Sequence, residues 1–285
     1  MAATVPIITL ITDFGGSGSY VGVMKGVILS ITPQARLVDI THQINPQDIQ
    51  QAASVLATVY PYFPAHTVHL VVVDPGVGGA RRPIAVETPH GRFVAPDNGV
   101  LTQVLLRAER WQVVALDNPA FWRAAPSHTF HGRDIFSPAA AHLAGGRALS
   151  ELGTAIDDPV QLAPPQLEVT ERFIRGRVVH IDHFGNVLTD ITRLSWLADG
   201  TVRFEPLDPR LEAQPPLCFE AASARVSFGW HVIEGMRHNY GEVPAKRPVA
   251  LISSSGELEI AVNQGSAQNE LGAKLGDPVT LFFTR

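Results

Sequence analysis

Cysteine is almost absent from the 285-residue chain, since Cys218 is the only one. A single cysteine excludes a disulfide framework and a cysteine-rich metal site. Basic residues show no excess either: 22 lysines and arginines against 27 aspartates and glutamates give a net charge of −5, without the electrostatic footprint of nucleic-acid binding. No apolar run approaches the length of a membrane span. Nucleic-acid and membrane partners are therefore not expected.

Several site motifs are missing as well. Neither a dinucleotide-binding fingerprint nor a P-loop lysine motif stands in register with a strand and a helix. No histidine pair has the spacing of four with a glutamate that marks zinc hydrolases, and the pair His128 and His131 has no evident third ligand. The amino-terminal segment lacks the basic start and cleavage site of a signal peptide. We therefore expect a cytoplasmic protein without a metal.

What is present suits two folded domains. Hydrophobic residues make up 45% of the chain, and its length allows one large and one smaller domain. Residues 1–160 contain strand-like and helix-like segments, whereas residues 170–285 contain short strands and turns. Residues 153–169, rich in proline and without a clear period, form the expected linker. The sequence predicts an α/β amino-terminal domain and an all-β carboxyl-terminal domain, either a small barrel or a sandwich.

The segment Leu70–Arg82 (LVVVDPGVGGARR) is the most informative one. Its apolar start is typical of a strand buried on both faces of a parallel sheet, and Asp74 follows at the carboxyl end, where such sheets bind ligands. The glycines allow a sharp turn and close approach to a ligand, and Arg81 comes seven residues after the aspartate. The alternative is a structural turn with a capping aspartate and a solvated arginine pair.

A second apolar run, residues 6–12, ends at Asp13 and a glycine-rich turn, and a helix is expected over Tyr20–Ile31. This order is typical of the opening of a nucleotide-binding α/β unit. In that interpretation the Asp13 carboxylate grips ribose hydroxyls, and the alternative is a helix N-cap. A further helix is expected with Asn45 as its cap and Pro46 at the first helical position.

Polar residues gather at two more turns. Residues 127–136 (SHTFHGRDIF) place two histidines, an arginine and an aspartate just before a helix expected over Ala139–Ala144. His131 is the candidate for chemistry because imidazole titrates near neutrality, although a lone histidine is more often structural. Residues 182–186 (DHFGN) form a turn whose polar side chains either hold a ligand or cap the turn.

Six motifs run in order along nearly the whole chain: residues 11–15 (ITDFG), 73–78 (VDPGVG) with Arg81, 95–99 (APDNG), 129–136 (TFHGRDIF), 181–186 (IDHFGN) and 254–263 (SSGELEIAVN). Together they resemble the S-adenosylmethionine hydroxide adenosyltransferases. This family is also called the S-adenosylmethionine hydrolases and is related to fluorinases and chlorinases. Six motifs in one order are far more specific than any one of them.

The resemblance implies a nucleoside-binding α/β sandwich domain and a β-rich, barrel-like carboxyl-terminal domain. It also implies a homotrimer whose active sites lie between the amino-terminal domain of one subunit and the carboxyl-terminal domain of a neighbour. The implied reaction is hydrolysis of S-adenosyl-L-methionine to adenosine and L-methionine by attack of water or hydroxide at the ribose 5′ carbon, without metal or cofactor. The family's catalytic triad maps onto Asp74, Arg81 and His131. Which of Asp74 and His131 accepts the proton from water stays open here.

Substrate contacts implied by the resemblance fall in both domains. Asp13 would bind the ribose hydroxyls, Asp182 the methionine ammonium and Asn186 the methionine carboxylate. Phe130 and Phe184 would form aromatic walls of the pocket, and core packing is the alternative for both. Weaker candidates for contact with methionine or adenine are Ser254, Ser255 and the backbone at Val262.

Two other functions stay open. Halide-using relatives replace the aspartate by tyrosine and the His-Gly pair by Tyr-Ser, whose serine binds halide. Asp74, His131 and Gly132 therefore disfavour a synthase of 5′-halo-adenosine. A nonenzymatic sensor of S-adenosylmethionine or adenosine is the other alternative, and it has no need of a water-activating triad.

Overall fold

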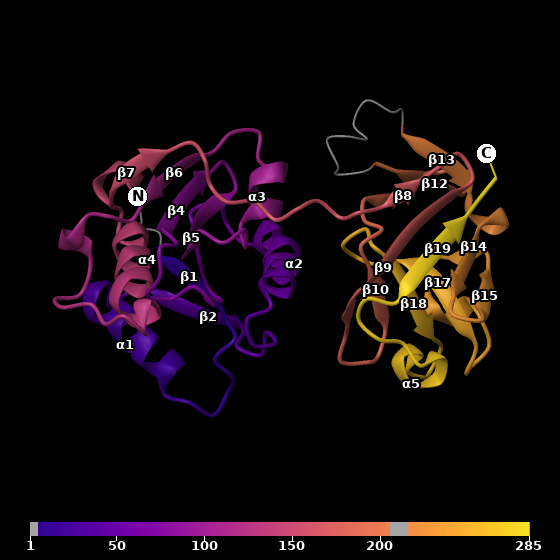
Figure 1. Cartoon of the computed structure of the whole chain (residues 1–285), viewed down its shortest axis with the longest axis horizontal. Coiled ribbons are helices and arrows are strands. Elements are labelled where there is room, and N and C mark those ends of the chain that lie inside the picture. The colour runs from indigo at the N-terminus through magenta and orange to yellow at the C-terminus, as the bar shows by residue number, and fades with distance from the viewer. Residues whose placement is uncertain (1–4, 206–215, 285) are drawn as a thin grey trace. The chain divides into compact units, whose positions relative to one another are not determined.

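The computed structural model describes residues 5–205 and 216–284, and the chain divides into two compact units, Met1–Leu162 and Ala163–Arg285 (Figure 1). The predicted domains also include residues 1–4, 206–215 and 285, which lie outside the described residues. Each unit has a hydrophobic core of its own. No helix in the described part of the chain is long and apolar enough to cross a membrane.

The amino-terminal unit is a three-layer α/β sandwich around a mixed sheet. Its described residues contribute seven strands to this sheet, in the spatial order β2 (Arg36–Thr41), β1 (Ile7–Thr12), β3 (Val68–Val72), β5 (Gly91–Pro96), β4 (Pro83–Thr88), β6 (Gln112–Ala115) and β7 (Thr154–Ile156). The first four in this order run parallel, and the last three continue the sheet with antiparallel pairing. The carboxyl ends of β1 and β3 therefore lie at the same edge.

Strand β3 confirms the prediction from its apolar residues. Every residue of the strand is buried, and it lies between β1 and β5 with parallel pairing on both sides. Leu70 and Val72 pack into the core on one face of the sheet, whereas Val71 and Val73 pack into the core on the other. A strand covered on both faces favours apolar side chains, which four of the five residues of β3 have, the exception being the buried His69.

Helices cover both faces of this sheet, α1 and α4 on one face and α2 and α3 on the other (Figure 1). The α-helices of this unit are α1 (Tyr20–Ile31), α2 (Ile49–Val59), α3 (Thr102–Arg107) and α4 (Ser137–Ala144). Short 3₁₀ turns occupy Tyr60–Tyr62, Pro119–Phe121 and Leu149–Glu151, and a π-helix at Gly132–Phe136 leads into α4.

The start of α2 differs from the prediction. Asn45 is not the cap: the helix begins directly after Asp48, whose carboxylate accepts a hydrogen bond from the Gln51 N–H at 2.9 Å. The reason lies at Gln47, whose φ of 66° is left-handed and interrupts a helix that starts earlier. The Gln47 N–H is therefore outside the helix and donates instead to Asp13 in the loop after β1.

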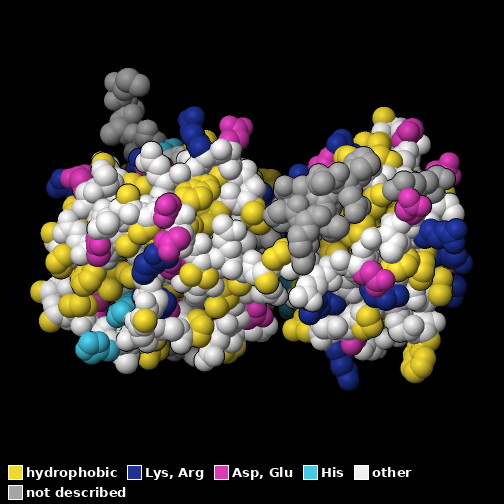
Figure 2. Space-filling view, turned by 45° about the horizontal axis from the view of Figure 1, so that its top comes forward, with side chains coloured by type: hydrophobic (Ala, Val, Ile, Leu, Met, Phe, Trp, Pro, Cys, Tyr) yellow, Lys and Arg dark blue, Asp and Glu magenta, His cyan; other side chains and the backbone are white. Residues whose placement is uncertain are grey.

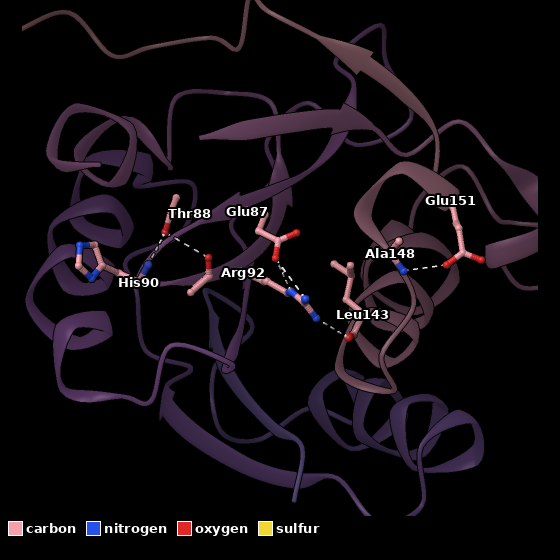
Figure 3. A network of polar contacts seen from close by, with 8 residues as sticks. Glu87, Thr88, His90, Arg92, Leu143, Ala148 and Glu151 are labelled. Atoms are coloured by element: carbon pink, nitrogen blue, oxygen red, sulfur yellow. Dashed lines mark hydrogen bonds and ion pairs between the residues drawn. The ribbon is translucent and has the colours of Figure 1, made fainter. Parts of the chain in front are cut away.

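A polar network fastens the end of α4 to the sheet (Figure 3). Arg92 of β5 donates from Nη1 to the Leu143 carbonyl at 3.1 Å, and from Nε and Nη2 to Glu87 of β4 at 3.2 and 3.1 Å. Carbonyls in the last turn of a helix lack regular partners, and a cation there complements the helix dipole. This network therefore fixes α4, which directly follows the π-helix that begins after His131.

The carboxyl-terminal unit is built mainly of β-strands. Within its described residues, nine strands form a sheet in the spatial order β15 (His231–Glu234), β14 (Arg225–Phe228), β19 (Pro278–Phe282), β9 (Phe173–Ile181), β10 (Val187–Thr189), β18 (Leu258–Val262), β17 (Pro248–Ile252) and β16 (Met236–Arg237), with β8 (Glu168–Val169) paired to β9. Contact between β15 and β17 shows that this sheet curls into a nearly closed barrel.

The rest of this unit is small. A second sheet consists of β11 (Leu194–Trp196), β12 (Thr201–Phe204) and β13 (Leu217–Glu220), and the helical elements are α5 (Ala267–Leu271) with 3₁₀ turns at Ala221–Ser223 and Tyr240–Glu242. The predicted fold class, an α/β domain followed by a barrel-like β domain, is confirmed.

Charges of both signs are interspersed over the surface. On the face of the amino-terminal unit that Figure 2 shows, basic side chains lie beside acidic ones. Exposed ion pairs of this unit include Lys25 with Asp39 and Arg147 with Glu151. This mixture agrees with the small net negative charge of the chain.

Candidate functional site

Three side chains from two segments, the turn after β3 and the loop before α4, meet beyond the carboxyl end of β3. Arg81 donates from Nε to Asp74 Oδ1 at 2.8 Å and from Nη2 to Asp74 Oδ2, which makes a bidentate ion pair. The same Nη2 lies 2.8 Å from Nδ1 of His131. The side chains of Asp74 and Arg81 are only 6% and 10% exposed. The fold thus brings together the three residues that the sequence marks as a triad.

The contact between Arg81 and His131 determines the protonation of the imidazole. A guanidinium has donors only, so Nδ1 of His131 is the acceptor, and the neutral ring carries its hydrogen on Nε2. Burial and the positive charge of Arg81 lower the pKa of His131 from its ordinary value of 6.5. The imidazole is therefore neutral at pH 7, with Nε2 available as a hydrogen-bond donor.

The motif at residues 95–99 contacts the residues next to Asp74 and Arg81. Arg82 donates from Nε to Asp97 Oδ2 at 2.8 Å, so this arginine is committed to a different carboxylate from Arg81. Asn98 donates from Nδ2 to the last carbonyl before Asp74 at 2.9 Å. These contacts separate the two adjacent arginines and hold the end of the strand.

His131 stands at the start of the π-helix. The Ser137 N–H donates to the carbonyl of Gly132, five residues earlier, and the Ser137 hydroxyl donates to the same carbonyl at 2.7 Å. At the other end of this wide turn, the fully buried Phe136 supports Arg81, with Cζ 5.2 Å from the ring centroid. Such π-helical turns are rare and occur often at functional sites.

The loop before His131 is held by Asp134, which is nearly inaccessible to solvent. Its carboxylate accepts from the Ser127 N–H at 2.9 Å and from Arg133 at 2.6 and 2.7 Å. Burial raises the pKa of Asp134, but hydrogen bonds from Arg133 and Ser127 outweigh burial and hold the pKa below 3.8. The charged carboxylate therefore stays available to fix the loop.

This loop and the glycine-rich turn approach each other at Gly78. The φ of Gly78 is 75°, and a Cβ there would lie 2.3 Å from the carbonyl oxygen of His128. Only glycine fits such a conformation and such a distance. The close approach keeps Asp74 and Arg81, on either side of the turn, within reach of His131.

Asp13 lies beyond the carboxyl end of β1. Its Oδ2 accepts a hydrogen bond from the Gln47 N–H at 2.9 Å. The cap position of α1 is occupied by Ser19, so the alternative interpretation of Asp13 as a helix cap is wrong. The left-handed residue before α2 thus orients this carboxylate.

Phe130 belongs to an aromatic cluster in the same unit. Its ring centroid lies 5.9 Å from that of Phe14 and 5.0 Å from that of Tyr20, in edge-to-face geometry. Its other neighbours are Arg133, with Cζ 5.3 Å from the ring centroid, and Gly132, where a Cβ would lie 3.1 Å from the ring. The ring is half-buried, between the deep core and solvent.

In the carboxyl-terminal unit, Asp182 closes the turn between β9 and β10. Its Oδ1 accepts from the N–H groups of Phe184 and Asn186, both at 2.8 Å, and its Oδ2 accepts from Asn186 Nδ2 at 2.9 Å. The turn-capping interpretation of Asp182 therefore holds, and a ligand-binding role would be additional. Phe184 is 75% exposed, so core packing does not explain this residue.

The weaker candidates occupy different surroundings. Ser254 is exposed and Ser255 half-buried in the turn between β17 and β18, whereas the side chain of Val262 packs into the core and leaves only its backbone for a ligand. Sequence reasoning misses Tyr240, whose hydroxyl donates to the buried Glu259 at 2.8 Å. It also misses His42 beside the Asp13 loop, because no motif marks either residue. Among the described residues, no group of three or more histidine, cysteine or acidic side chains is placed to hold a metal ion.

Comparison with known proteins places both units in one family. The family model for the SAM hydroxide adenosyltransferase N-terminal domain matches residues 8–153, and the model for the C-terminal domain matches residues 176–280. A protein of Salinispora tropica named (R)-S-adenosyl-L-methionine hydrolase is 37% identical over 280 residues, with 96% of this chain and 97% of the relative covered. A protein of the same name from Thermus thermophilus is 39% identical over 279 residues, with 95% and 97% covered.

Structural similarity extends over the whole chain. The crystal structure of an uncharacterized conserved protein from Thermotoga maritima matches with a TM-score of 0.81 at 36% identity and covers 98% of this chain and 100% of that one. Fluorinases match at lower identity, for example 30% over 245 residues for that of Actinoplanes sp.. Since both family models match, in order and over most of its length, the chain belongs to the SAM hydroxide adenosyltransferase family.

Proposed function

We propose that this chain hydrolyses (R)-S-adenosyl-L-methionine to adenosine and L-methionine. Relatives of that name align over nearly their whole length. The observation that carries the proposal is the contact of Arg81 with both Asp74 and His131, because it supplies the groups that a water nucleophile needs. The (R) configuration at sulfur follows the relatives' names, whereas the sequence motifs leave it unspecified.

The reaction is an in-line displacement at the ribose 5′ carbon. The oxygen of water forms a bond to the carbon while the carbon–sulfur bond breaks, and the bonding pair moves to sulfur, which becomes the neutral thioether of methionine. Because the leaving group starts as a sulfonium cation, it needs no metal or cofactor to depart. Holding the water in line lowers the activation free energy by on the order of several kcal/mol.

Asp74 and His131 take different parts in handling the water. Nδ1 of His131 already accepts from Arg81, so the remaining nitrogen, Nε2, donates to the water oxygen and stabilises hydroxide as it forms. Arg81 adds a positive charge that persists at every working pH. Asp74, the anion of the triad, accepts the proton that the water loses.

Two other activities have less support. A halide-using enzyme needs a hydroxyl near the reacting carbon, and Gly132 is buried against Phe130 without one. A sensor of S-adenosylmethionine or adenosine gains nothing from a buried ion pair aimed at an imidazole. A halide-using enzyme would form a different product from hydrolysis, and a sensor would form none.

Chromatography of the reaction products tests the proposal. The purified protein is incubated with each sulfonium epimer, alone and with added chloride or fluoride. Equal amounts of adenosine and methionine from the (R) epimer, unchanged by halide, are expected; Arg81→Ala abolishes them, and Arg147→Ala, which removes a surface cation, does not. A 5′-halo-adenosine product, or bound ligand without product, overturns hydrolysis.

The assembly is part of the same proposal. In a cytoplasmic homotrimer, residues 1–160 of one subunit and residues 170–285 of a neighbour complete each active site. Phe184 is 75% exposed, beside Asp182 and Asn186 in the same turn, so its ring is accessible to substrate or to a second subunit. Mixed trimers of Arg81→Ala and Asp182→Ala subunits are expected to regain activity, because one combination of domains is then intact. Mixed trimers that stay inactive, or a monomeric mass by light scattering, contradict the arrangement.

A further inference from the structure

We infer that His42 is a positioning residue that aims the Asp13 carboxylate at the ribose hydroxyls. This inference rests on the proposed function, which places Asp13 on the ribose. His42 follows β2 and belongs to none of the sequence motifs. Its side chain and its carbonyl both contact the segment that carries Asp13.

A β-bulge brings His42 to the end of β1. The pairing of Leu10 with Asp39 is followed by the pairing of Ile11 with Thr41, so one residue of β2 has no partner. A bulge of this kind bends the strand and changes the direction of the side chains that follow it. His42 therefore lies against the loop after β1 rather than continuing the ladder.

His42 holds this loop at both ends. Its Nδ1 lies 3.0 Å from Thr12 Oγ1, and its carbonyl accepts from the Gly15 N–H at 2.7 Å. Thr12 Oγ1 also accepts from the Phe14 N–H at 3.3 Å. Asp13 lies between these fixed points, so its backbone has little freedom to turn the carboxylate away.

The orientation of the imidazole is set from the outside by Asp39. Nε2 of His42 is buried and lies 3.1 Å from Asp39 Oδ1, within ion-pair distance but without hydrogen-bond geometry. Burial raises the pKa of Asp39, but Lys25, which donates to it at 2.6 Å, and His42 lower the pKa by more. A carboxylate beside Nε2 favours the hydrogen on that atom, so Nδ1 accepts from the Thr12 hydroxyl.

The other side of the Asp13 carboxylate is fixed by Gln47. The Gln47 N–H donates to Oδ2 at 2.9 Å, and Oδ1 has no hydrogen-bond partner among the described residues. A carboxylate with one oxygen held and the other free suits a pair of neighbouring hydroxyls, which donate to it. Removal of the His42 contact frees the loop, and the affinity that depends on those hydroxyls is then lost.

The test is the dependence of affinity on the ribose hydroxyls. Isothermal titration gives Kd for adenosine and for 2′,3′-dideoxyadenosine. The ratio of the Kd for the dideoxy compound to the Kd for adenosine measures how much the ribose diol contributes to affinity. Asp13→Ala is expected to reduce this ratio by about tenfold or more, as for loss of charge-assisted hydrogen bonds. His42→Leu reduces the same ratio with little change in Kd for the dideoxy compound, and His42→Asn, which keeps an acceptor near Nδ1, restores it.

The outcomes separate this inference from the proposed function. If Asp13→Ala lowers the ratio and His42→Leu leaves it unchanged, positioning by His42 is wrong. If neither variant changes the ratio, the ribose contact of Asp13 is wrong. If His42→Leu does not fold, Thr12→Val removes the same contact from the other side, with Thr12→Ser as its rescue. His66→Leu, which removes an exposed histidine of the same unit, is expected to leave the ratio unchanged.

Discussion

Acid is expected to destabilise the amino-terminal unit through His69, a residue of β3 with no part in the proposed reaction. Its side chain is fully buried and stacks on Phe93, with ring centroids 5.1 Å apart. Nδ1 lies 2.8 Å from Thr9 Oγ1, and Nε2 has no hydrogen-bond partner among the described residues. Nothing at the site compensates a positive charge, so burial lowers the pKa of His69 from 6.5 to about 4.

The sign and size of the effect follow from this shift. The unfolded chain binds a proton at His69 more readily than the folded chain does, so the stabilisation is complete above pH 6.5 and is lost as the pH falls toward 4. A shift of about 2.5 units corresponds to about 3 kcal/mol of unfolding free energy. About 2 kcal/mol of this is lost by pH 5.

Urea denaturation between pH 7 and pH 5 measures the effect. The comparison is between Thr9→Val and Thr9→Val with His69→Phe, because the valine avoids a stranded hydroxyl and the phenylalanine keeps the stacking on Phe93. The variant with His69 is expected to lose about 2 kcal/mol more than the variant without it. His66→Phe, at an exposed site, serves as the control. Equal losses in the two Thr9→Val backgrounds refute the reasoning.

Three further outcomes are expected. His131→Gln, which keeps an N–H donor, retains a larger single-turnover rate than His131→Ala; equal losses would argue that the imidazole accepts the proton instead. The single-turnover rate of the unmodified protein falls in acid with an apparent pKa below 6.5, because protonation of His131 removes the acceptor of the Arg81 hydrogen bond; an apparent pKa at or above 6.5 contradicts this. Gly78→Ala lowers the unfolding free energy by roughly 1–3 kcal/mol, and more than Gly146→Ala, which also has a positive φ but open space around it; equal changes in urea denaturation mean that the clash with His128 is absent.

Much of the fold could be predicted because its signals are local. The apolar run before Asp74 predicts β3 correctly, since burial on both faces favours apolar residues and only His69 departs from that pattern. The cap of α2 could not be predicted in the same way. Asn45 and Asp48 are both good caps, and the choice between them depends on the left-handed Gln47, which the neighbouring loop holds.

In the candidate site, too, local patterns and motifs predict some residues and miss others. Asp74 and Arg81 are seven residues apart across a glycine-rich turn, so their contact follows from a local pattern, and the motifs add His131 from a distant segment. His42 carries no such signal, because its place beside Asp13 depends on one unpaired residue in β2. Tyr240 and Glu259 likewise lie 19 positions apart, in a 3₁₀ turn and in β18, and no motif links them.

The extra residue in the π-helix before α4 determines the direction in which His131 points. Each residue of an α-helix turns the chain by about 100°, so one residue fewer within Gly132–Phe136 would restore an ordinary helix and swing everything on its amino-terminal side by about that angle. His131 would then point away from Arg81 although every triad residue was still present. The length of this segment therefore matters as much as its residue types: deletion of one residue within Gly132–Phe136 is expected to abolish the site although Asp74, Arg81 and His131 all remain.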